Sequence, residues 1–199
     1  MRAWLAELGA PPAVAQGRLT FPLRHAADWV ARRFSLDGRV TRAFVAVFFR
    51  EVAAYLREPG DAREAARAEV ATAIAAHRPD VVVAHSLGSV VAYEALHAHP
   101  GLEVPLLLTL GSPLGLPYAV HERLRPAPVS GMGRRPSGVG TWVNIADPGD
   151  PVAIPPRLAR RFHGIAQDLT GTAGHLNPHA VAGYLRSAAV AGALTPWLT

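Results

Sequence analysis

DVVVAHSLGSVVAYEAL, residues 80–96, is the most informative segment of this chain. Its first part, Val81 to Ala84, is a short apolar and mostly β-branched run, the pattern of a strand buried on both faces. From Ser89 to His97, just past its end, apolar residues occur at helical spacing. The turn between them reads AHSLG. This order predicts a nucleophile elbow, the sharp strand-to-helix turn that holds a serine hydroxyl clear of the sheet.

The residue types around the serine suit such a turn. Strand and helix approach closely, so the positions two before and two after Ser86 should be small. Ala84 departs from the usual glycine but is small, and Gly88 is the standard residue. The N–H of Leu87 begins the helix, where it and the positive helix end would stabilise an oxyanion. We therefore predict Ser86 as a nucleophile and Leu87 as an oxyanion-hole donor.

The composition indicates one domain without thiol chemistry. The chain has 199 residues, 50% of them hydrophobic, which suffices for a sizeable core. Cysteine is absent, so no disulfide or thiolate metal site can form, which fits a reducing, cytoplasmic location. The net charge is +5 and all 20 basic residues are arginines, spread out and without interleaved aromatics. We expect a solvated surface and no nucleic-acid partner. No run reaches about 18 apolar residues, so no stable membrane insertion is expected.

Helical and strand patterns alternate along the chain. Helices are expected at 41–56, 61–77 and 178–189, and strands at 81–84, 104–110, 141–146 and 161–169. The buried side of the first helix is expected to carry Phe44, Val45, Val47, Phe48, Val52 and Tyr55, and that of the second Ala62, Ala65, Ala66, Val70, Ala73 and Ile74. Residues 112–140 form a loop or lid-like insertion. We predict one α/β domain, residues 1–199, with a mainly parallel sheet flanked by helices.

A serine nucleophile needs two partners, and candidates for both follow the elbow. The base must reach the hydroxyl, and an acid must orient the base. Asp147 and Asp150 both come just after the strand at 141–146, and Asp147 has the alternative role of bracing the turn. GHLNPH, residues 174–179, offers His175 and His179 between the last strand and the last helix. His179 is expected inside the first helical turn.

These motifs resemble the α/β-hydrolase family, in its lipase and esterase branch. The resemblance extends from about residue 44 to about residue 185, and residues 1–40 are atypical. It rests on VVVAHSLGSVVAYEAL, LLLTLGSPLG, WVNIADPGDPVA and GHLNPHAVAGYL, in this order. The resemblance implies Asp150 as the triad acid, because Asp-Pro-Val matches the Asp-x-Val arrangement of lipase-like hydrolases. It implies His175 as the base. It also implies substrate contacts at Ser112, Pro113 and Leu114.

The N-terminal half departs from the family pattern. The family takes a second oxyanion donor from a loop after an earlier strand, normally announced by His-Gly, and no His-Gly occurs before residue 80. Strands on the far side of the elbow strand are also missing, apart from a short candidate at 19–23. Either residues 1–40 supply the donor and cover the sheet edge, or the chain is an N-terminal truncation of a longer hydrolase. We expect this edge to be covered by the N-terminal segment or by a second copy in a homodimer.

The sequence thus predicts a serine hydrolase that cleaves carboxylic esters of a small-molecule acyl substrate through an acyl-enzyme. No metal or organic cofactor is implied. An amide hydrolase or peptidase of the same fold is one alternative, because a triad does not distinguish esters from amides. A degenerate hydrolase fold that acts as a binding module is the other, and the reduced N-terminal half supports it.

Overall fold

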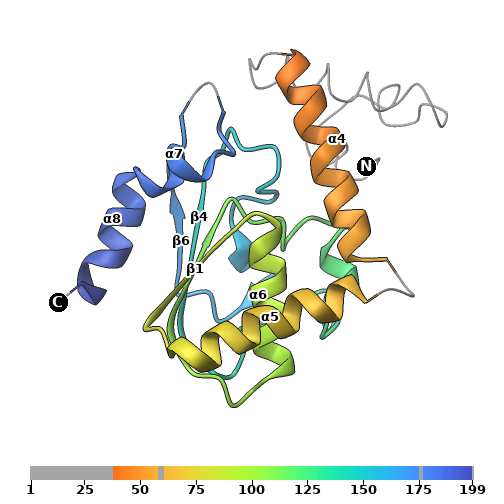
Figure 1. Ribbon diagram of the computed structural model, residues 1–199. Helices are drawn as coiled ribbons and strands as arrows, with labels where there is room; N and C mark the ends of the chain where they lie inside the picture. Colours follow the sequence, from red (N-terminus) through yellow and green to blue (C-terminus); the bar gives the residue numbers. More distant parts are fainter. Residues whose placement is uncertain (1–37, 58–60, 175–176, 199) are drawn as a thin grey trace.

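A computed structural model describes residues 38–57, 61–174 and 177–198 (Figure 1). The predicted strand at 19–23 lies outside these residues. The helices are α4 (Gly38–Tyr55), α5 (Ala62–His77), α6 (Leu87–Ala98), α7 (Val181–Leu185) and α8 (Ala188–Leu194). The strands are β1 (Val81–His85), β2 (Val104–Leu110), β3 (Gly133–Arg134), β4 (Val139–Ala146), β5 (Phe162–His163) and β6 (Gln167–Thr170). The predicted closing helix is therefore two short helices, and Ser187 caps the second by accepting the N–H of Val190.

The main sheet is parallel, as the sequence predicts for the α/β class. Its strand order is β1-β2-β4-β6, and each neighbouring pair runs in parallel. The crossover from β1 to β2 is α6. Because all four strands run the same way, the segments that follow them meet at one edge of the sheet. The elbow serine and the loops after β2, β4 and β6 therefore lie together.

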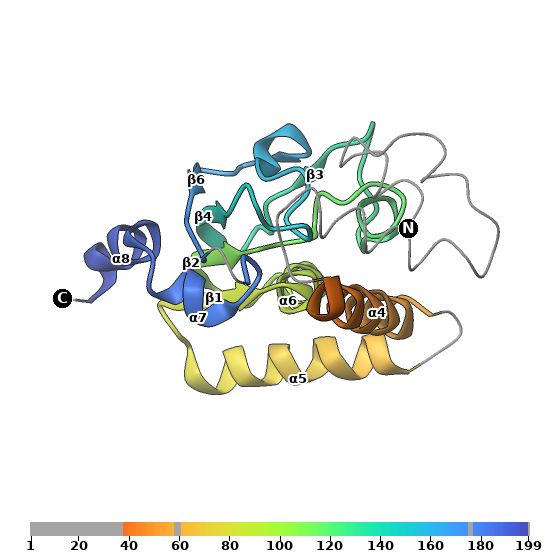
Figure 2. The ribbon, with the colours of Figure 1, turned by 90° about the horizontal axis from the view of Figure 1, so that it is seen from above.

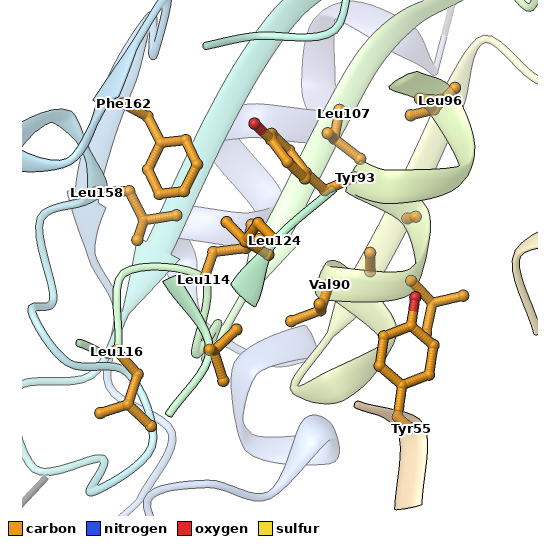
Figure 3. Close-up of a cluster of buried hydrophobic side chains, with 14 of the residues drawn as sticks. Tyr55, Val90, Tyr93, Leu96, Leu107, Leu114, Leu116, Leu124, Leu158 and Phe162 are labelled. Atoms are coloured by element: carbon orange, nitrogen blue, oxygen red, sulfur yellow. The ribbon is translucent and has the colours of Figure 1, made fainter. Parts of the chain in front are cut away.

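Two apolar clusters pack against opposite faces of this sheet. Figure 2 shows helices of the two clusters on opposite sides of the sheet, α6 on one side and α8 on the other. From Leu106 to Leu108, successive residues of β2 alternate between the two clusters, because successive side chains of a strand point to opposite faces. Leu107 belongs to the cluster that includes α4, α5 and α6, and Leu106 and Leu108 to the one that includes α7 and α8. Figure 3 shows the first cluster, in which Tyr93 and Phe162 pack edge to face.

The segment 112–140 is a folded part of the core. Leu114, Leu116, Val120 and Leu124 are all buried and belong to the first apolar cluster (Figure 3). Four leucine and valine side chains removed from water stabilise the segment, at roughly 1.5–3 kcal/mol each. The sequence pattern of this segment lacks periodicity because it packs through irregular turns.

The buried face of α5 differs from the expected one. Arg63 is 3% exposed, whereas the predicted inward residues Ala62, Ala65 and Ala73 are exposed. The Arg63 guanidinium pairs with the fully buried carboxylate of Glu94, with 2.8 Å from Nε to Oε2. Burial opposes the charge of Arg63, but the hydrogen bond and negative charge of Glu94 raise its pKa above the ordinary value.

On α4, Phe48, Val52 and Tyr55 are buried as predicted, but Val47 is 42% exposed. The hydroxyl of Tyr55 donates to Glu94 at 2.7 Å, so α4, α5 and α6 share one buried polar network. None of the helices in the described ranges combines the length and apolar character needed to cross a bilayer.

Within the described residues, β1 is an edge strand. It pairs only with β2, and Val83 is 43% exposed. The expectation of a strand buried on both faces is therefore wrong at Val83. The predicted cover of this edge, by the N-terminal segment or by a second copy, stays a prediction.

Candidate active site

Ser86 occupies the turn between β1 and α6, as the elbow motif predicts. Its backbone has φ 52° and ψ −133°, a conformation that a non-glycine residue adopts only at a cost of about 1–3 kcal/mol. The Ser86 N–H donates to the Leu110 carbonyl of β2 at 3.0 Å, and the Ser89 hydroxyl donates to the Ser86 carbonyl at 2.6 Å. These contacts from two neighbouring elements hold the strained serine in place.

Leu87 is the first residue of α6, so its N–H has no acceptor one turn earlier in the helix. This is the position predicted for an oxyanion donor. The prediction that position 88 must be small for strand and helix to approach is not supported. A Cβ on Gly88 would meet no atom within 4 Å outside the helix's own backbone.

The histidine that reaches Ser86 is His179. Its Nε2 lies 2.8 Å from the Ser86 Oγ, and its Nδ1 lies 2.8 and 2.9 Å from the two carboxylate oxygens of Asp150. The predicted base, His175, lies outside the described residues, and the histidine that contacts both Ser86 and Asp150 is His179. The reason is the start of the helix: α7 begins at Val181, which leaves His179 in the loop after β6.

A turn signal in the sequence marks that loop. The Ala180 N–H donates to the Asn177 carbonyl at 3.0 Å, and the His179 N–H donates to the Asn177 side chain at 3.3 Å. Asparagine at the first and proline at the second position favour such a turn. Asn177-Pro178 therefore provided evidence that His179 precedes the helix.

Asp150 stands where the resemblance implied the acid. It is 2% exposed and contacts His179 through both oxygens. Its Oδ1 also accepts the Val152 N–H at 2.8 Å, so the valine of the Asp-x-Val arrangement contributes through its backbone.

Asp147 has the bracing role considered for it. Its Oδ1 accepts the Gly149 N–H and its Oδ2 the Ala173 N–H, each at 2.7 Å. The first bond closes the turn that carries Asp150, and the second ties this turn to the loop that leads to His179.

Two residues at the site were missed by the sequence analysis. Tyr184 of α7 is fully buried, and its hydroxyl donates to Asp150 Oδ2 at 2.7 Å. Gly111, just after β2, has φ +53°, and a Cβ there would lie 2.8 Å from Asp150 Oδ2. A glycine at the end of a strand is a weak signal, and a tyrosine in a helical pattern reads as core.

His85 packs beside His179. Its Nε2–H donates to the His179 carbonyl at 2.9 Å, and the two ring centroids are 4.6 Å apart. Burial, and next the charge of His179, lower the pKa of His85 below its ordinary value. His85 therefore favours its neutral form, which can hold the backbone of His179 without adding a positive charge beside it.

Ser112, Pro113 and Leu114 are buried just after Gly111. The Ser112 hydroxyl lies 2.7 Å from the Ser89 hydroxyl and accepts the Leu114 N–H at 3.2 Å. These contacts assign Ser112 a structural part in supporting the elbow. Its predicted contact with substrate stays a prediction.

In the part of the chain that the structure describes, no group of three or more histidine, aspartate or glutamate side chains is arranged to hold a metal ion. Comparisons of this chain with protein-family models, with curated proteins and with solved structures find no match.

Proposed function

We propose that this protein is a serine hydrolase of the α/β-hydrolase type that cleaves carboxylic esters. One observation carries the proposal: a strained serine on an elbow, with its Oγ 2.8 Å from His179 Nε2, whose Nδ1 contacts the buried Asp150 carboxylate at 2.8 Å. This order of nucleophile, base and acid is the arrangement that activates a hydroxyl at neutral pH.

In the acylation step, Ser86 Oγ attacks the carbonyl carbon of the ester. The new bond forms as His179 Nε2 takes the hydroxyl proton, and Asp150 stabilises the resulting imidazolium through Nδ1–H. The carbonyl oxygen becomes an oxyanion, for which we propose the Leu87 N–H as one donor. The bond to the alcohol oxygen then breaks, and His179 returns its proton to that oxygen as the alcohol leaves.

Deacylation repeats these steps with water. The water oxygen attacks the acyl carbon while His179 Nε2 takes one of its protons. The bond to Ser86 Oγ then breaks, and the proton returns to the serine as the carboxylic acid leaves. The serine proton moves between two groups that already lie 2.8 Å apart, Ser86 Oγ and His179 Nε2, and we propose that the reaction needs no cofactor. The absence of cysteine from the chain supports a cytoplasmic location.

An amide hydrolase or a binding module remains the alternative at this site. An amide would follow the same steps with an amine as the leaving group. A binding module would need neither the proton relay nor the strained serine, so these two features favour an enzyme.

The test compares labelling by a fluorophosphonate and hydrolysis of p-nitrophenyl esters of increasing chain length. Ser86→Ala should abolish both, and His179→Ala should lose as much turnover as Ser86→Ala because triad members act as a unit. Ser137→Ala is the matched control, since Ser137 is exposed and should leave both unchanged. Equal labelling of wild type and Ser86→Ala would contradict the proposal, and activity towards p-nitroanilides alone would favour the amide alternative.

A further inference from the structure

Building on the proposed function, we propose that Tyr184 is a positioning residue that sets the orientation and the proton affinity of Asp150, and through Asp150 those of His179. It touches neither the nucleophile nor the reacting atoms. Its role follows from the direction of its hydrogen bonds, from the donors around the acid, and from its place in the chain.

The hydrogen bonds of Tyr184 have one possible direction. Its hydroxyl lies 2.9 Å from the Asp147 nitrogen and 2.7 Å from Asp150 Oδ2. The backbone N–H of Asp147 can only donate, so the phenol oxygen accepts from it. The phenol proton therefore points to Asp150. Tyr184 acts as a fixed donor to the acid.

With this donor, each oxygen of the Asp150 carboxylate accepts one hydrogen bond in addition to its contact with His179. Oδ1 accepts the Val152 N–H at 2.8 Å, Oδ2 accepts the Tyr184 hydroxyl at 2.7 Å, and His179 Nδ1 lies between them. Donors on both oxygens fix the plane of the carboxylate. They also spread its charge, which makes it a weaker acceptor for the His179 ring than a carboxylate with fewer donors.

The segment that carries His179 is tied to the acid's turn on both sides of the histidine. Before it, the Ala173 N–H donates to Asp147 Oδ2 at 2.7 Å. After it, Tyr184 donates to Asp150. Loss of the Tyr184 hydroxyl would release the second tie, so the relative placement of base and acid depends on it.

Burial and the negative charge of Asp150 keep Tyr184 protonated, in its donor form. It faces Asp150 and Asp147 from the turn after β4, His179 from its own segment, and His85 from β1, whose ring centroid lies 5.9 Å away. Burial, and next the negative charge of Asp150, raise the pKa of Tyr184 well above its ordinary value. Tyr184 therefore donates throughout the pH range in which the serine site would operate.

The experiment is Tyr184→Phe, measured by ester hydrolysis as a function of pH. We expect kcat to fall about tenfold or more with KM within about twofold, because the variant disturbs the reacting geometry but not the binding of substrate. We also expect the acidic limb of the kcat/KM profile to move to higher pH by about half a unit, because Asp150 becomes a stronger acceptor.

Tyr55→Phe is the matched control. The Tyr55 hydroxyl also donates to a buried carboxylate, Glu94, at the same distance of 2.7 Å. Tyr55 of α4 belongs to the first apolar cluster (Figure 3), whereas Tyr184 belongs to the second. Both variants should lower the melting temperature, and only Tyr184→Phe should move the pH profile. A Tyr184→Phe profile that coincides with that of Tyr55→Phe would overturn the proposal.

A second measurement separates this proposal from the proposed function. The His179 ring resonance, identified by its loss in His179→Ala, is titrated by NMR in wild type and in both phenylalanine variants. If wild type neither hydrolyses esters nor reacts with a fluorophosphonate, the proposed function fails, yet a higher titration midpoint in Tyr184→Phe alone would still support the positioning role. An unchanged midpoint would overturn the positioning role whether or not the protein is active.

Discussion

Replacement of Gly111 by alanine would place one methyl group against three side chains of the site, those of Asp150, Tyr184 and His179. A Cβ at this position lies 2.8 Å from Asp150 Oδ2, 3.0 Å from the Tyr184 ring and 3.3 Å from His179 Nδ1. Carbon atoms pack against their neighbours at about 3.5–4.0 Å, so at least one of these side chains must move by about half an ångström or more. Asp150 is the nearest, and its other contacts hold it in place.

Gly111→Ala is expected to lower both the unfolding free energy and kcat, for different reasons. The φ of Gly111 is +53°, and an alanine held in this region costs roughly 1–2 kcal/mol of folding free energy. Displacement of the acid relative to the base should lower kcat about 10- to 100-fold, because a misplacement of about 1 Å costs about 100-fold. KM should change little.

The measurement pairs kcat from ester hydrolysis with the unfolding free energy from urea denaturation. Gly131→Ala separates the two effects, because Gly131 has φ +74° but a Cβ there would meet no atom within 4 Å. This control carries the backbone strain without the contact, so it should lose stability and keep its kcat. If Gly111→Ala loses no more activity than Gly131→Ala, then Asp150 and His179 do not work in the arrangement described, and the reasoning fails.

Two further predictions concern stability. Glu94→Gln should lower the unfolding free energy by about 3–5 kcal/mol in urea denaturation, because it leaves the buried Arg63 without its counter-charge, and a loss under about 1 kcal/mol would contradict a structural ion pair. Burial lowers the pKa of His121, so the unfolded chain binds a proton at higher pH than the folded one. Stability should therefore fall as the pH drops below about 6.5, by up to about 1.4 kcal/mol per pH unit for this group. His121→Gln should reduce that slope, and an equal slope in both proteins would exclude His121 as the cause.

Local patterns were sufficient to predict the central strands and the elbow. The strand predicted at 104–110 coincides with β2. The one predicted at 141–146 matches β4 except that β4 begins two residues earlier, at Val139. Buried parallel strands are continuous apolar runs, so they leave a signal that needs no knowledge of their partners. Ser86 could be found for the same reason, since the strand, the turn and the helix are consecutive in the sequence.

The buried faces of the helices were predicted less well, because an alanine says little about which side of a helix is buried. In α5, the many alanines are compatible with several buried faces, and a charged residue is normally assigned to solvent. Arg63 is nevertheless buried, because Glu94 of α6 supplies a charge and hydrogen bonds at the same depth. A partner 31 residues away has no local signature in the sequence of α5.

The choice between His175 and His179 depended on where the last helix begins, and tertiary contacts decide that. Gly183 packs against the segment before the histidine so closely that a Cβ would lie 1.8 Å from the Ala173 carbonyl oxygen. Tyr184, one residue later, reaches the acid through its hydroxyl. These two contacts fix the position of α7, and the turn at Asn177 then delivers His179 to Ser86. The same helix that contacts Asp150 thus also decides which histidine lies beside Ser86. Spacing within the sequence could therefore narrow the choice to two histidines but could not make it.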